Sequence, residues 1–141
     1  MKIIISLIIT CLTITVKAQQ GAYALPPKTA NCGGFIIDSA VSNKSLAGKT
    51  LIYGNVSRCF DRAKGAGSII EILDNNTSKI LDTCYADVNG DFKIIVAAGS
   101  YKIWAARIGL GDIRTNTIDL EAQTSVKITF YLSNPPDIID R

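Results

Sequence analysis

The sequence predicts an all-β fold, a seven-stranded antiparallel β-sandwich preceded by an N-terminal extension. Apolar and polar residues alternate with a period of two in several segments, which is typical of half-buried strands. Glycine, asparagine and aspartate recur between these segments at a spacing of about ten residues, as turns do in sandwiches. No segment keeps the helical period of about 3.6 residues. The chain of 141 residues is long enough for one such domain.

The strands are expected one after another along the second half of the chain. We predict them at 51–57, 68–74, 78–86, 92–97, 101–108, 113–121 and 126–132. The Asn89-Gly90 pair predicts a hairpin turn between the third and fourth of them. The alternation directs four large side chains into the core: Phe92, Tyr101, Ile103 and Phe130.

The first eighteen residues predict a secretory signal peptide. Lys2 precedes an apolar run of about a dozen residues, and Ala18 supplies the small residue expected before the cleavage point. A retained membrane anchor is the alternative, but the run is short for a bilayer span. The protein is therefore expected to be exported, to the periplasm, the outer-membrane surface or the extracellular space.

The rest of the chain is expected to contain three parts. Residues 19–47 are rich in proline, glycine and serine, which indicates an extension or linker, and residues 35–38 are compatible with a strand. The sandwich is expected over residues 48–133. Residues 134–141 form a tail, because Pro135 and Pro136 cannot donate to a strand ladder.

Charge argues against a nucleic-acid partner. The chain has 15 lysine and arginine residues and 12 aspartate and glutamate residues, a formal net charge of +3. Lys2 and Lys17 leave with the signal peptide, so the mature chain is close to neutral. Nucleic-acid binding needs a basic stripe, and none remains. No later segment is long and apolar enough to predict a membrane span in the mature chain.

The absence of histidine restricts the chemistry. The sequence has no histidine at all. This removes the commonest general base, the commonest transition-metal ligand and the Ser-His and Cys-His nucleophile pairs. We therefore expect no catalytic residues, no enzymatic activity and no cofactor.

Three cysteines remain after the signal peptide: Cys32, Cys59 and Cys84. In an exported protein, one disulfide with one thiol left over is expected. With strands that alternate in direction, the first and third strands end at the same pole of the sandwich, where Cys59 and Cys84 lie. The sequence therefore predicts a Cys59–Cys84 disulfide, with Cys32 left over.

Trp104 is the candidate binding residue. If Tyr101 and Ile103 face the core, parity places Trp104 and Lys102 outside, where an indole can stack on a sugar ring or anchor a protein. Tyr131 also faces outward and is expected to extend this surface if its strand lies nearby. The alternative is that the N-terminal extension or the C-terminal tail covers Trp104.

The turn at residues 87–91 has the composition of a calcium ligand set. Asp87, Asn89 and Asp91 offer the oxygen ligands that Ca²⁺ takes. The spacing departs from the EF-hand loop, since glycine is the fourth residue and no glutamate stands at the twelfth. Aspartate and asparagine are also ordinary turn residues, and this alternative is the favoured one.

The turns and core positions between residues 51 and 133 resemble a known family. The matching segments are Gly54-Asn55-Val56, Gly67-Ser68-Ile69-Ile70, Ala86–Phe92, Gly99-Ser100-Tyr101 and Arg107-Ile108-Gly109. Together they resemble the carboxypeptidase regulatory-like domain, a transthyretin-like, immunoglobulin-like β-sandwich related to carbohydrate-binding folds. The family's usual threonine is Ala86 here, and its usual aromatic after Gly109 is Leu110.

The resemblance implies a non-catalytic function. Such domains assist folding or mediate contacts, and related copies precede outer-membrane nutrient receptors. We therefore expect an exported module that mediates protein contacts at the cell envelope. The alternative is a carbohydrate-binding module that uses an exposed aromatic patch around Trp104, so the expected partner is an envelope protein or a glycan.

Overall fold

The computed structural model describes residues 32–134. The predicted signal peptide, residues 19–31 of the predicted extension and the tail after residue 134 lie outside the described residues. Within residues 32–134, no helix has the length and apolar character needed to cross a membrane.

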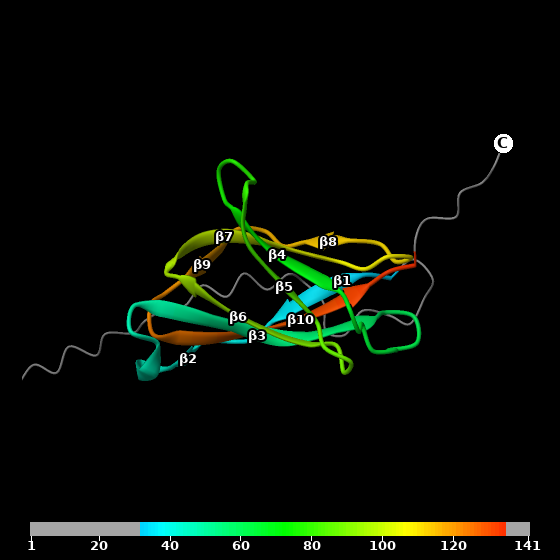
Figure 1. The fold of residues 1–141 in the computed structure, drawn as a ribbon, viewed down its shortest axis with the longest axis horizontal. Helices are drawn as coiled ribbons and strands as arrows, with labels where there is room; N and C mark the ends of the chain where they lie inside the picture. The colour runs from blue at the N-terminus through cyan, green and yellow to red at the C-terminus, as the bar shows by residue number, and fades with distance from the viewer. Residues whose placement is uncertain (1–31, 135–141) are drawn as a thin grey trace, which may run out of the picture.

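The described residues form two β-sheets of five strands each, which pack as the two layers of a sandwich (Figure 1). The prediction of an all-β sandwich is therefore confirmed. Sheet A consists of β1 (Gly34–Ile37), β2 (Val41–Ser42), β3 (Lys49–Arg58), β6 (Asp91–Ala97) and β10 (Thr124–Leu132). Sheet B consists of β4 (Ile69–Asp74), β5 (Ile80–Tyr85), β7 (Gly99–Ala106), β8 (Ile113–Arg114) and β9 (Ile118–Leu120). A short 3₁₀ turn, η1 (Lys44–Leu46), precedes β3.

The order of strands determines which edges are open. In sheet A the order is β1-β10-β3-β6, with β2 also beside β10; in sheet B it is β5-β4-β7-β8, with β9 also beside β7. The strands β6 and β5 therefore stand at the ends of their sheets. They are consecutive in the chain and belong to different layers.

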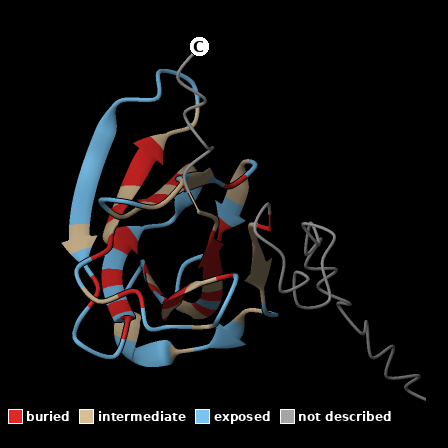
Figure 2. Cartoon of the chain, turned by 90° about the vertical axis from the view of Figure 1, so that its right-hand side faces the viewer, coloured by how far each residue is buried: buried red, intermediate tan, exposed pale blue. Residues whose placement is uncertain are grey.

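Alternate side chains fill the space between the sheets, as expected for period-two strands. Ile103 and Phe130 are fully buried and Phe92 is 5% exposed, while Tyr101 is half-buried against the same core. The inward direction predicted for these four residues is confirmed. Buried and exposed positions alternate along β6, and Ile94 and Val96 are among its buried residues. Figure 2 shows such alternation as bands of colour along the strands.

Not every strand pair is antiparallel. The strands β10 and β3 run parallel, from the pair Thr124↔Thr50 to the pair Leu132↔Arg58. Parallel neighbours need a long crossover connection, and here the chain between them forms all of sheet B and also β6 of sheet A. The two backbones approach closely at Gly54, where an added Cβ would lie 1.7 Å from the carbonyl oxygen of Ile128. Glycine is therefore required at this position of β3.

The turn at Asn89-Gly90 is present, but it is not a hairpin within one sheet. Gly90 has a φ of +80°, and its amide donates to the carbonyl of Asp87 at 2.9 Å. The turn joins β5 of sheet B to β6 of sheet A, so it carries the chain from one layer to the other.

Two further differences concern strand boundaries. The segment expected as one strand over 113–121 contains two short strands, β8 and β9, which both pair with β7. The segment expected as an extension or linker contains β1, close to the strand considered possible at residues 35–38, and also β2. Both pair with β10, and the β1 pairs run from Gly34↔Tyr131 to Ile37↔Ile128. The described part of the extension is therefore built into sheet A.

Candidate functional site

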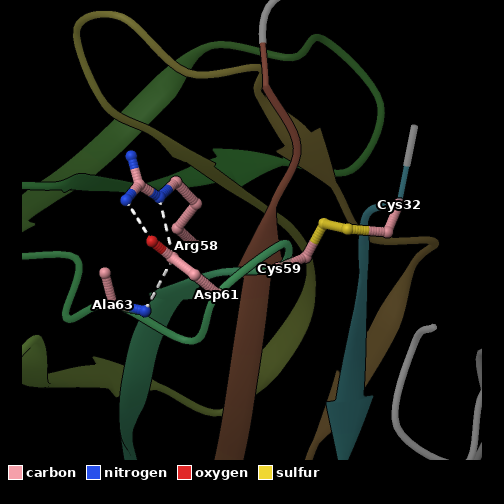
Figure 3. Close-up of a disulfide and its surroundings, with 5 residues drawn as sticks. All are labelled: Cys32, Arg58, Cys59, Asp61 and Ala63. Carbon is pink, nitrogen blue, oxygen red and sulfur yellow. Dashed lines mark hydrogen bonds and ion pairs between the residues drawn. A yellow bond between two sulfur atoms is a disulfide. The ribbon is translucent and has the colours of Figure 1, made fainter. Parts of the chain in front are cut away.

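The disulfide joins Cys32 to Cys59, with the two Cα atoms 5.9 Å apart (Figure 3). The predicted Cys59–Cys84 pairing is therefore wrong. Strand order explains the observed pair: β1 lies beside β10 and β10 beside β3, so the start of β1 meets the end of β3. The amide of Cys59 also donates to the carbonyl of Leu132 at 2.9 Å, which fixes this end of β3 to β10.

The two cysteines of the predicted pair pack in different hydrophobic clusters of the fold. Cys59 packs with Cys32 and Tyr131 in a small cluster that is separate from the main core. Cys84 pairs with Ile70 on β4 and packs against the main core between the sheets. Cys84 is a free thiol, and burial, aided by the negative charge of Asp82, raises its pKa to about 11. A neutral, half-buried thiol of this kind is a poor nucleophile.

Charged side chains at the end of β3 and in the turn that follows it lie at the disulfide end of sheet A. The guanidinium of Arg62 lies 4.6 Å from the ring centroid of Tyr131, within cation–π distance. Arg58 forms an ion pair with Asp61 (Figure 3). The hydrogen bond from Arg58, together with a backbone hydrogen bond from Ala63, lowers the pKa of Asp61 to about 2.

Trp104 lies on the outer side of sheet B, as parity predicts. It is half-buried, between the fully buried Ile103 and Ala105. Its Nε1 donates to Asp112 Oδ2 at 2.6 Å, so the polar end of the indole is already bonded. Lys102, two residues earlier on the same strand, is also half-buried.

The neighbours of Trp104 are charged. Glu71 on β4 and Arg114 on β8 stand directly opposite it in the two flanking strands. Trp104 therefore stands between an acidic and a basic residue on the outer side of sheet B. This row is the polar, aromatic surface of sheet B.

Tyr131 does not join that surface. It belongs to β10 of sheet A, lies beneath Arg62 and is only 8% exposed. Trp104 belongs to the other sheet. The predicted patch of Trp104, Lys102 and Tyr131 is therefore not assembled, because the two strands lie in opposite layers and each side chain faces away from the space between them.

Several oxygen atoms of the turn considered for calcium already accept hydrogen bonds. Asp87 Oδ1 accepts from the amides of Asn89 and Asp91 at 2.8 and 3.0 Å. Asp91 Oδ1 accepts from Asn55 Nδ2 at 2.8 Å. Lys64 Nζ donates to Asn89 Oδ1 at 2.9 Å, which brings a positive charge to the turn. Within residues 32–134 no group of acidic or cysteine side chains is arranged to hold a metal ion.

An exposed edge strand was not identified from the sequence. The strand β5 pairs with β4 on one side, and its other side ends sheet B. Five of its six residues are exposed, including Ile80 at 51%, Leu81 at 50% and Tyr85 at 67% (Figure 2). Asp82 is the one charged residue of the strand.

A groove over sheet A was also not identified from the sequence. Its volume is about 690 Å³, and it is lined by Tyr53, Gly54, Asn55, Tyr85, Asp87, Asp91, Phe92, Lys93 and Lys127. Tyr53 on β3 stands opposite Lys93 on β6 and opposite Lys127 on β10. The three side chains therefore form one row across three strands, which we call the Lys-Tyr-Lys row. Alternation gives each residue's face, but only the strand order brings them together.

Comparison with family models and with curated proteins finds no match for this chain. The likeness to the carboxypeptidase regulatory-like domain therefore depends on the turn and core residues alone.

Proposed function

We propose that this protein is an exported, non-catalytic β-sandwich module that makes protein contacts at the cell envelope through the β5 edge. The observation that carries this proposal is the exposure of β5, a complete six-residue strand at the end of sheet B. Natural proteins usually protect such an edge with lysine, proline, a bulge or a covering segment. Here the strand contains neither lysine nor proline, its bulge is confined to Leu81 near its start, and three of its large apolar side chains are about half or more exposed.

An edge of this kind binds a partner by strand addition. The unpaired amides and carbonyls of an edge strand are a template for an extended segment, and alternate side chains supply specificity. Ile80, Leu81 and Tyr85 offer apolar area to such a segment, and burying this area provides the main favourable free energy. The register shift of the β4–β5 pair lies on β5, because Ile72 pairs with Asp82 and Leu73 with Ile80, which leaves Leu81 without a partner on β4. The regular ladder available to a partner is therefore the stretch from Asp82 to Tyr85.

The expected export of the protein and its likeness to a family of sandwich domains also support the proposal. The sequence begins with a signal-peptide pattern, and the Cys32–Cys59 disulfide agrees with an oxidising compartment. A transthyretin-like, immunoglobulin-like sandwich of the carboxypeptidase regulatory-like kind is consistent with two facing sheets and with turns at Gly67, Gly90 and Gly109, all of which have positive φ. Such a domain, without histidine, is suited to contact rather than to catalysis.

Site-specific photo-crosslinking tests this proposal. Benzoyl-phenylalanine is introduced at Leu81 or at Ile95, which are 50% and 52% exposed and lie on β5 and β6. After illumination of intact cells, we expect a discrete crosslinked protein from position 81 and none from position 95. Leu81→Lys should abolish co-purification of that protein, whereas Ile95→Lys should not. No crosslink at position 81, or the same product from both positions, would contradict the proposal.

Carbohydrate binding around Trp104 is the second candidate function. It is favoured by the hydrogen bond from the indole to Asp112, which fixes a half-exposed aromatic ring on the sheet surface. Trp104→Ala should abolish binding on a glycan array and leave the melting temperature nearly unchanged. Unfolding of this variant would instead indicate a core role for the indole.

A further inference from the structure

We infer that the groove over Tyr53 binds a sugar that carries a carboxylate, such as a uronic acid, because the Lys-Tyr-Lys row lies next to the hydrogen-bonded carboxylates of Asp87 and Asp91. This site lies on sheet A. It goes beyond protein contact at β5, and neither inference requires the other.

The basic end of the groove has ammonium groups available for an anion. Among the described residues, neither Lys93 nor Lys127 takes part in an ion pair or a side-chain hydrogen bond. Neighbouring strands are about 4.8 Å apart, so the two lysines stand about 10 Å apart with Tyr53 between them. Each ammonium has three donors, and one carboxylate between two flexible stems can accept from both.

The acidic end selects the kind of anion. Asp87 and Asp91 line the same groove, and each already accepts hydrogen bonds from the turn or from Asn55. Their remaining lone pairs accept from hydroxyl groups and repel a second negative charge. A ligand with one carboxylate and several hydroxyl groups therefore fits both ends. A phosphodiester chain or a polyacidic peptide would bring negative charge against the aspartates.

The floor and rim of the groove supply aromatic surface. Tyr53 is 37% exposed between the lysines, and Tyr85 at the rim is 67% exposed. Aromatic side chains offer a large contact area with few rotatable bonds, and the C–H face of a pyranose ring packs on such surfaces. A ring that contacts Tyr53 has its carboxylate within reach of the lysines on either side.

Calorimetric titration with methyl galacturonoside, which carries one carboxylate on one sugar ring, and with its methyl ester tests this inference. The ester keeps the sugar ring and removes the charge. We expect binding of the acid, which weakens as salt is added because the site is exposed, and a loss of about tenfold or more with the ester. The double variant Lys93→Ala/Lys127→Ala should lose binding by a similar factor.

A matched control separates the site from general charge. Lys49 lies on β3, the strand of Tyr53; it is exposed and does not line the groove. Lys49→Ala should bind as the unchanged protein does, and circular dichroism should show all variants folded. Absence of binding, equal binding of acid and ester, equal binding of poly-glutamate, or binding that survives the double variant would overturn the inference. The crosslinking result at Leu81 bears only on the protein contact.

Discussion

The disulfide end of sheet A and the β5 edge of sheet B are built on opposite principles. At the disulfide end, a covalent bond joins the start of β1 to the end of β3, a hydrogen bond from Cys59 holds that end to β10, and the guanidinium of Arg62 covers Tyr131. At the β5 edge, a whole strand has a partner on one side and exposes its apolar side chains. The cysteines of the two regions differ in the same way: Cys59 at the disulfide end is covalently bonded, whereas Cys84 on β5 is a free thiol. Stability is therefore concentrated away from the strand that we propose for binding.

The largest expected effect comes from removing the disulfide. The bridge spans a sequence separation of 27 residues, which corresponds to about 3–4 kcal/mol of loop-closure stabilisation. Cys32→Ser/Cys59→Ser should lower the free energy of unfolding by about this amount in urea titrations. The matched variant Cys84→Ser should change it by about 1 kcal/mol or less. Equal losses in both variants would contradict the division between the two regions.

Two tyrosines provide a second comparison. Tyr131 is 8% exposed and Tyr85 is 67% exposed. Tyr131→Ala removes a buried ring and the surface on which Arg62 packs, so it should cost about 3 kcal/mol. Tyr85→Ala should cost about 0.5 kcal/mol or less, because an exposed side chain loses little burial. Thermal unfolding of both variants measures the difference, and a larger loss at Tyr85 would show that β5 is covered in the folded protein.

The smallest effect concerns acid stability. The pKa of Asp61 is lowered to about 2, first by the hydrogen bond from Arg58. A lowered carboxyl pKa stabilises the fold above the ordinary value of about 3.9, and this contribution is lost as the pH falls through about 2. The melting temperature of Asp61→Asn should therefore be slightly below that of the unchanged protein at pH 6. The two should converge near pH 2, and a constant gap at all pH values would exclude the ion pair as its source.

Local patterns predicted much of the fold. Period-two alternation identified the strands of the core and the inward direction of Phe92, Ile103 and Phe130, because side-chain direction in a strand depends only on neighbouring residues. Strand order depends on contacts that are distant in the sequence. The parallel pair β3–β10 and the insertion of β1 into sheet A were missed for this reason.

The wrong Cys59–Cys84 pairing shows that the alternation of side-chain direction along β3 was not used in predicting the disulfide. The direction of the strands correctly placed the ends of β3 and β5 at one pole, but a pole has two sheets and each sheet has two faces. Val56 points into the core, so alternation along β3 places Cys59 on the opposite face, whereas Cys84 pairs with the core residue Ile70. Parity at residue 59 could have excluded the pair. Its true partner, Cys32, required the position of β1.

The candidate binding surfaces were likewise predictable only in part, because parity gives the face of a residue and not its neighbours in other strands. Parity was sufficient to place Trp104 and Lys102 outside sheet B. It was not sufficient to show that Tyr131 lies in the other sheet under Arg62, or that Lys93, Tyr53 and Lys127 form one row. Surfaces that cross several strands depend on register, which a single sequence does not contain.

Hydrogen exchange of β5 tests the central claim most directly. Amide exchange is followed by mass spectrometry in the purified protein and in the same protein within isolated cell envelopes. We predict that peptides covering residues 80–85 exchange quickly in the purified protein and become protected in the envelopes, while peptides from β10 are protected in both. Equal exchange of residues 80–85 in the two samples would contradict the claim that β5 is the binding edge.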